Sequence, residues 1–106
     1  PSGVSSNPLF GKLLKNRTYK SLNDVHKILW GKPKGVAIKL CGKPDFEYGA
    51  NTRGVAGFSY HDLNMVFTDS RLIISSVMIH YNEGAGRVSG ITFTDDKGKR
   101  WEVVRR

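Results

Sequence analysis

The distribution of apolar residues predicts a short helix near the start of the chain, followed by alternating apolar and polar positions. The helix is expected over residues 21–30, where Ser21 is a favoured N-cap and Asp24 puts a carboxylate at the positive helix end. Gly31, followed by Pro33, ends it. The apolar residues on one face of this helix are Leu22, Val25, Ile28 and Leu29.

An earlier helix is predicted over residues 7–16, with Asn7 as its N-cap and Pro8 at the first helical position. Its apolar stripe consists of Leu9, Phe10, Leu13 and Leu14. Gly11 in its middle weakens it by roughly 1 kcal/mol relative to alanine. Residues 1–6 are small and polar and are expected to form a flexible N-terminus, whereas residues 7–106 form a single α+β domain.

After the second helix, short alternating runs are separated by glycine, proline, asparagine and aspartate, which is typical of strands joined by turns. The predicted strands are residues 35–40, 55–60, 63–67, 72–81, 88–94 and 99–105. Residues 41–54 are rich in turn-forming residues and are expected to form a long loop. The predicted architecture is therefore α+β, with two short N-terminal helices packed on one face of an antiparallel sheet of four to six strands.

Alternation in the predicted strand 72–81 separates its side chains into two faces. The better core face holds Ile73, Ser75, Val77, Ile79 and Tyr81. The opposite face holds Ile74, Ser76, Met78 and His80. The residues expected to join the core from the last two strands are Ile91, Phe93, Trp101 and Val103.

Composition narrows the class of protein and the class of partner. A chain of 106 residues, 39% hydrophobic and 25% charged, suits one globular domain. No apolar run approaches the roughly 20 residues that a membrane-spanning helix needs. Seventeen basic against nine acidic residues give a net charge of +8, which favours nucleic acid, anionic lipid headgroups or an acidic protein surface as partner.

Catalytic and metal chemistry find little support in the residue pattern. Cys41, His61 and Asp62 could in principle serve as nucleophile, base and orienting group, but nothing near Cys41 beyond two lysines would activate a thiol. A buried structural role for this cysteine is the expected one. The histidines are too widely spaced for a helix-borne metal pair, so no catalytic residue, metal or cofactor is predicted.

Two binding hypotheses from different classes remain. The first is a noncatalytic protein-interaction module whose partner has an acidic surface, with contacts from Phe46, Tyr48, Arg53 and Tyr60, residue types favoured at binding hot spots. The second is a small basic nucleic-acid-binding domain that uses an exposed sheet face and an aromatic stacking platform. Its phosphate contacts would come from Lys39, Arg53, Arg87 and Arg100. The identity of the partner, the compartment and the oligomeric state do not follow from the sequence.

A resemblance extends over residues 18–81. The helix ending in Gly31-Lys-Pro33, a strand, a glycine-rich segment and two aromatic strands are similar to the small outer-membrane-assembly lipoproteins of the SmpA/OmlA (BamE) type. The wider group resembles β-lactamase inhibitor proteins. The positions that match are Asp24, Val25, Leu29, Gly31, Pro33, Tyr60, Val66 and Phe67. The resemblance implies two helices on an antiparallel sheet, a cell-envelope location and a binding role without catalysis.

Overall fold

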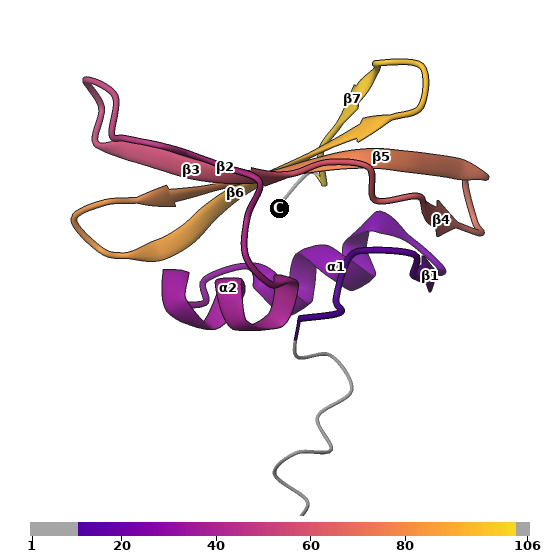
Figure 1. The fold of residues 1–106 in the computed structure, drawn as a ribbon, viewed down its shortest axis with the longest axis horizontal. Coiled ribbons are helices and arrows are strands. Elements are labelled where there is room, and N and C mark those ends of the chain that lie inside the picture. The colour runs from indigo at the N-terminus through magenta and orange to yellow at the C-terminus, as the bar shows by residue number, and fades with distance from the viewer. Residues whose placement is uncertain (1–10, 104–106) are drawn as a thin grey trace, which may run out of the picture.

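The computed structural model describes residues 11–103, which form an α+β fold of two helices and a mixed seven-stranded sheet. The helices lie together on one side of the sheet and leave the other side open (Figure 1). The elements in chain order are β1 (Thr18–Tyr19), α1 (Leu22–Leu29), α2 (Lys34–Cys41), β2 (Phe46–Tyr48), β3 (Val55–Tyr60), β4 (Met65–Phe67), β5 (Leu72–Asn82), β6 (Arg87–Asp95) and β7 (Arg100–Trp101).

Helix α1 confirms the helix predicted over residues 21–30. The Asp24 carboxylate accepts a hydrogen bond from the backbone N–H of Ser21 at 3.2 Å, so the predicted N-terminal cap is present. Gly31 has a φ of +73°, a left-handed conformation in which glycine is favoured, and it turns the chain out of the helix. Val25 and Leu29 are fully buried against the sheet, as the apolar spacing requires.

The strand predicted over residues 35–40 is wrong, because this segment forms helix α2. Its buried residues are Ala37, Leu40 and Cys41, a spacing of three and four that marks one face of a helix. Both helices end in the same pattern, leucine, any residue, glycine, lysine and proline, which occurs at residues 29–33 and again at 40–44. Gly42 has a φ of +88°, so the repeated pattern was a sequence signal for the second helix.

The helix predicted over residues 7–16 is not formed in its described part. Residues 7–10 lie outside the described residues, and residues 11–16 form turns and bends. Gly11 and Asn16 have φ values of +73° and +58°, which are incompatible with a right-handed helix. The two residues of the apolar stripe that the structure describes, Leu13 and Leu14, are nevertheless almost completely buried in the core.

Strand β5 is the centre of the sheet. Its first residues pair with β4 and its later residues pair with β3 along one edge, while β6 runs along the other edge and carries β7. Strand β2, in the segment predicted as a loop, pairs antiparallel with β3. Strand β1 pairs in parallel with β4, so the sheet is mixed and has seven strands, not four to six antiparallel ones. A two-residue strand such as β1 is too short for alternation to reveal.

A β-bulge corrects the predicted faces of β5. The register with β6 shifts between Ile74 and Ser76, which puts an extra residue, Ser75, into β5. The Ser75 hydroxyl donates to the backbone carbonyls of Thr94 and Asp95 at 3.3 and 3.1 Å. Ile74 is therefore fully buried and Ile73 is 41% exposed, the reverse of the prediction. Beyond the bulge, the core positions predicted for this strand are confirmed, since Val77, Ile79 and Tyr81 are buried.

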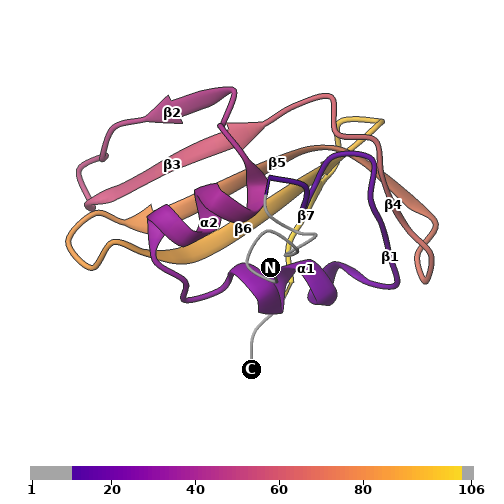
Figure 2. The same cartoon turned by 60° about the horizontal axis from the view of Figure 1, so that its bottom comes forward.

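The core lies between the helices and the covered face of the sheet (Figure 2). Phe58, Phe67 and Phe93 are fully buried at its centre. The rings of Phe67 and Phe93 meet edge to face with centroids 5.9 Å apart. The core positions predicted for Ile91 and Phe93 are confirmed, and Trp101 and Val103 pack against the core while remaining partly exposed.

Candidate functional site

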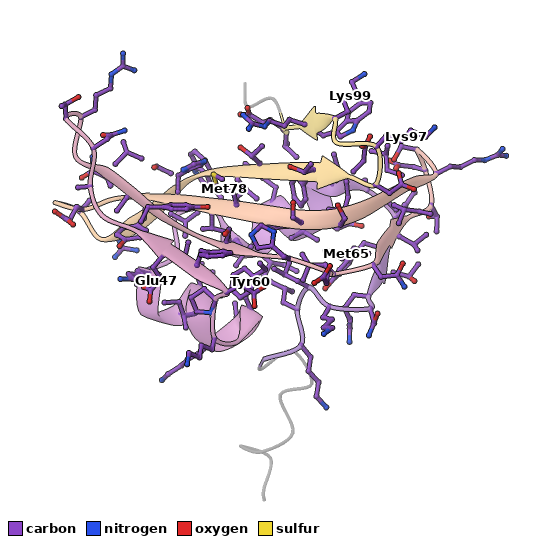
Figure 3. All side chains as sticks on the ribbon, turned by 45° about the horizontal axis from the view of Figure 1, so that its top comes forward. Glu47, Tyr60, Met65, Met78, Lys97 and Lys99 are labelled. Atoms are coloured by element: carbon purple, nitrogen blue, oxygen red, sulfur yellow. The ribbon has the colours of Figure 1, made fainter. Side chains whose placement is uncertain are left out.

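The open face of the sheet carries side chains that the strand register aligns into rows. Strands β2, β3, β5 and β6 contribute two rows of four, and strands β5, β6 and β7 contribute a third row of three. The rows are Phe46, Ser59, Met78, Thr92; Tyr48, Gly57, His80, Gly90; and Ser76, Thr94, Arg100. Figure 3 is turned toward this face, where the labelled Met78 lies.

Large and small residues alternate across the first two rows. The Tyr48 ring lies on Gly57, where a Cβ atom would be 3.1 Å from a ring carbon and 2.9 Å from the Ile79 carbonyl oxygen. The His80 ring lies over Gly90 in the same way, 3.6 Å from the position of a Cβ. The large side chains of β2 and β5 therefore form two ridges on this face. The small side chains of β3 and β6 leave the surface lower beside these ridges.

The ridge on β2 is the most exposed apolar feature of this face. Phe46 and Tyr48 are 62% and 39% exposed, and the Phe46 ring meets the His61 ring edge to face at 5.5 Å. Glu47, between them, lies on the helix side, where its carboxylate is 3.7 Å from the Lys34 ammonium. We call Phe46 and Tyr48 the aromatic ridge.

The other two predicted protein-contact residues lie elsewhere. Arg53 is exposed in the turn between β2 and β3, where the Asn51 side chain accepts hydrogen bonds from the backbone N–H groups of Arg53 and Val55. Tyr60 is only 4% exposed, and its hydroxyl donates to the Gly42 carbonyl at 2.7 Å. Because its ring belongs to the core, Tyr60 is not a surface contact residue, and its place on the covered face follows from the period of β3.

A groove of about 320 Å³ runs across the open face beside the aromatic ridge. Its polar lining consists of four hydroxyl side chains, two imidazoles and one guanidinium, with no carboxylate among the lining residues. These residues are Ser59, Ser76, Thr92, Thr94, His61, His80 and Arg100. Burial lowers the pKa of His80, opposed by the nearby Glu102 carboxylate, so His80 is neutral near pH 7 and Arg100 is the permanent cation of the groove.

The hairpin between β6 and β7 fixes the position of Arg100. The Asp95 carboxylate accepts hydrogen bonds from the backbone N–H groups of Lys97 and Lys99 and from the Trp101 indole N–H, all at 2.9 Å. The Lys99 ammonium lies 4.3 Å from the centre of the Trp101 ring. The hairpin rises above the open side of the sheet in Figure 1, so Arg100 is held at the edge of the groove.

The hydrogen bonds to Asp95 make the stability of this hairpin pH-dependent. The bond from Trp101, with those from Lys99 and Lys97, lowers the pKa of Asp95 below its usual value of 3.8. A carboxylate with a lowered folded-state pKa stabilises the fold above that usual value, and the contribution is lost as the pH falls through the folded-state pKa. Asp95→Asn should therefore lower the melting temperature at pH 7, and the difference from wild type should narrow below pH 4.

Differential scanning calorimetry from pH 7 to pH 2.5 would measure this narrowing. Asp96→Asn is the matched control, because Asp96 is the exposed neighbour in the same turn and should behave like the wild type throughout. A constant difference between wild type and Asp95→Asn across the pH range would contradict the assigned role of the carboxylate.

The cations predicted to contact phosphates are dispersed. Lys39 is exposed on helix α2, in the layer that covers the other side of the sheet. Arg53 lies at a hairpin tip, and the Arg87 guanidinium donates to the Gly31 carbonyl at 2.9 Å, toward the helices. Of the four residues, Arg100 alone lines the groove. The fold therefore does not gather them on one sheet face.

Cys41 and His61 line a second cavity, of about 260 Å³, next to Tyr60. The thiol is buried, and burial raises its pKa to about 12, so it stays protonated at neutral pH. Asp62 is exposed, and the His61 ring bonds to the Ser59 hydroxyl at 3.1 Å. Among the described residues, no cluster of histidine, cysteine, aspartate or glutamate side chains could hold a metal ion.

The part of the chain that the structure describes has no helix long and apolar enough to cross a membrane. Comparison of the sequence with protein-family models and with curated proteins, and of the fold with solved structures, gives no match.

Proposed function

We propose that this protein is a noncatalytic interaction module that binds another protein through the open face of its sheet. The observation that carries the proposal is the exposed aromatic ridge beside a groove rich in hydroxyl and imidazole groups, on the face that the helices leave uncovered. Exposed aromatic anchors next to polar, hydrogen-bonding positions are typical of protein-binding surfaces.

The width of the face favours a macromolecular partner. The aromatic ridge on β2 and Arg100 on β7 are separated by four strand spacings, through β3, β5 and β6. At about 4.8 Å per spacing, this amounts to roughly 19 Å along the sheet. A ligand that contacts both ends must be as wide as a peptide segment or a protein surface.

Charge favours an acidic partner. The net charge of +8 attracts anionic surfaces over the distance of a diffusional encounter. In the groove itself, the permanent charge is that of Arg100. The cell-envelope location remains part of the proposal through the resemblance to SmpA/OmlA lipoproteins, and fractionation of cells that produce the full-length gene product would test it.

Selection of random peptides displayed on phage against the 106-residue chain would test the binding role. Synthetic copies of the enriched peptides should shift the backbone amide signals of residues on the open face in an NMR titration. Phe46→Ala and Tyr48→Ala should each weaken their binding by about tenfold, because exposed aromatic anchors contribute most of the energy of such interfaces.

Val36→Ala is the matched control, since Val36 is a similarly exposed apolar residue on helix α2 in the opposite layer. The proposal fails if the peptides bind the helix layer, or if the ridge variants bind as well as the Val36 variant. It also fails if single-stranded oligonucleotides bind the open face more tightly than any peptide and their affinity falls steeply with salt concentration. That result would favour the nucleic-acid hypothesis.

A further inference from the structure

We infer that the row of Ser76, Thr94 and Arg100 is a subsite for a carboxylate side chain, so that the partner inserts an aspartate or glutamate at the β7 end of the groove. This inference rests on the proposed protein-binding function and specifies one contact of the same face. The three residues come from β5, β6 and β7, and the strand register brings them side by side.

The donors of this row are available to a ligand. Within residues 11–103, the guanidinium of Arg100 forms no ion pair, and the hydroxyls of Ser76 and Thr94 make no side-chain hydrogen bond. All three residues line the groove. A planar guanidinium with two neighbouring hydroxyls can donate to both oxygens of a carboxylate, which is the pairing that arginine geometry favours.

The fold holds the backbone at Arg100 in place before any partner arrives. The Asp95 carboxylate accepts hydrogen bonds from backbone N–H groups in the turn of the hairpin. It also accepts one from the indole of Trp101, the residue next to Arg100. At the bulge, the Ser75 hydroxyl donates hydrogen bonds to the carbonyls of Thr94 and Asp95. These bonds fix the start of the hairpin relative to β5. The backbone that carries the three donors is therefore already in place, so binding orders only their side chains.

Charge confines the subsite to one end of the groove. Glu102 follows Arg100 by two residues, just after β7, and its carboxylate lies near His80. A carboxylate there would be repelled by Glu102, whereas a carboxylate at Arg100 meets no acidic side chain among the groove-lining residues. The partner is thus expected to place its acidic residue at Arg100, at about 19 Å from the side chain that meets the aromatic ridge.

The test uses a minimal probe, N-acetyl-glutamic acid N-methylamide, titrated into the isotopically labelled 106-residue chain. It should shift the amide signals of Ser76 and Thr94 and the side-chain Nε signal of Arg100, whereas the matching glutamine probe should not. Arg100→Gln should abolish these shifts, and Arg100→Lys should weaken binding because it keeps the charge but loses the paired donors. Arg53→Gln, which removes an exposed arginine away from the groove, should bind like the wild type.

The peptide selection provides a second readout. Peptides enriched on the wild type should carry an acidic residue whose removal weakens binding about tenfold, and Arg100→Glu should switch the enrichment to basic residues. Some selected peptides could need the aromatic ridge yet carry no such acidic residue and bind Arg100→Gln as well as the wild type. That result would overturn the proposed carboxylate subsite and leave the proposed binding function intact. Stronger shifts with inorganic phosphate, together with oligothymidine binding that needs Arg100, would overturn it in favour of a nucleic-acid surface.

Discussion

Phe93→Ala is expected to lower the free energy of unfolding by about 3–5 kcal/mol, the range measured for phenylalanine removed from protein cores. The Phe93 side chain is fully buried and meets Phe67 edge to face, so its loss removes a large apolar contact and leaves a cavity. Since native proteins are stable by only about 5–15 kcal/mol, a loss of this size removes a large fraction of the total stability. Urea denaturation followed by tryptophan fluorescence would measure the loss.

Phe46→Ala makes the same chemical change at an exposed site and is the matched control. Phe46 is 62% exposed on the aromatic ridge, so its removal should change the free energy of unfolding by no more than about 0.5 kcal/mol. Similar losses at both positions would show that the aromatic ridge is part of the core and not a surface available for binding.

The second large effect distinguishes two adjacent isoleucines in β5. Ile74→Ala should cost about 2–5 kcal/mol, because Ile74 is fully buried, whereas Ile73→Ala should cost less than about 1 kcal/mol, because Ile73 is 41% exposed. The same denaturation experiment compares them. Simple alternation through this strand predicts the opposite order, so a greater loss at Ile73 would show that the bulge at Ser75 is absent.

The fold was predictable where the signal is local. The cap, apolar face and terminating glycine of α1 lie within a dozen residues, and the strand predicted over residues 55–60 has the bounds of β3. The strand predicted over residues 35–40 is wrong because this short apolar run fits the period of a strand or of a helix, although the second of the two repeated helix endings indicates a helix. The bulge in β5 could not be read from alternation, since it is set by bonds from Ser75 to residues 19 and 20 positions away.

The candidate site was predictable in part. Phe46 and Tyr48 were identified by residue type, and the placement of Ser76, Met78 and His80 opposite the core of β5 agrees with the groove that they line. The prediction of Tyr60 as a surface contact is wrong, because alternation along β3 places Tyr60 on the same face as Phe58, toward the core. The meeting of Arg100 with Ser76 and Thr94 depends on pairing across three strands, which short-range patterns do not specify.

The sequence by itself determined the α+β class, the position of α1, most strands, the basic character of the chain and the residue types suited to binding. These properties follow from composition and from backbone preferences that act over a few residues. Only the tertiary structure decided that β2 forms an edge of the sheet and that β1 runs parallel to β4. Those features arise from hydrogen bonds and packing between distant segments, whose free energy depends on the whole fold rather than on any local pattern.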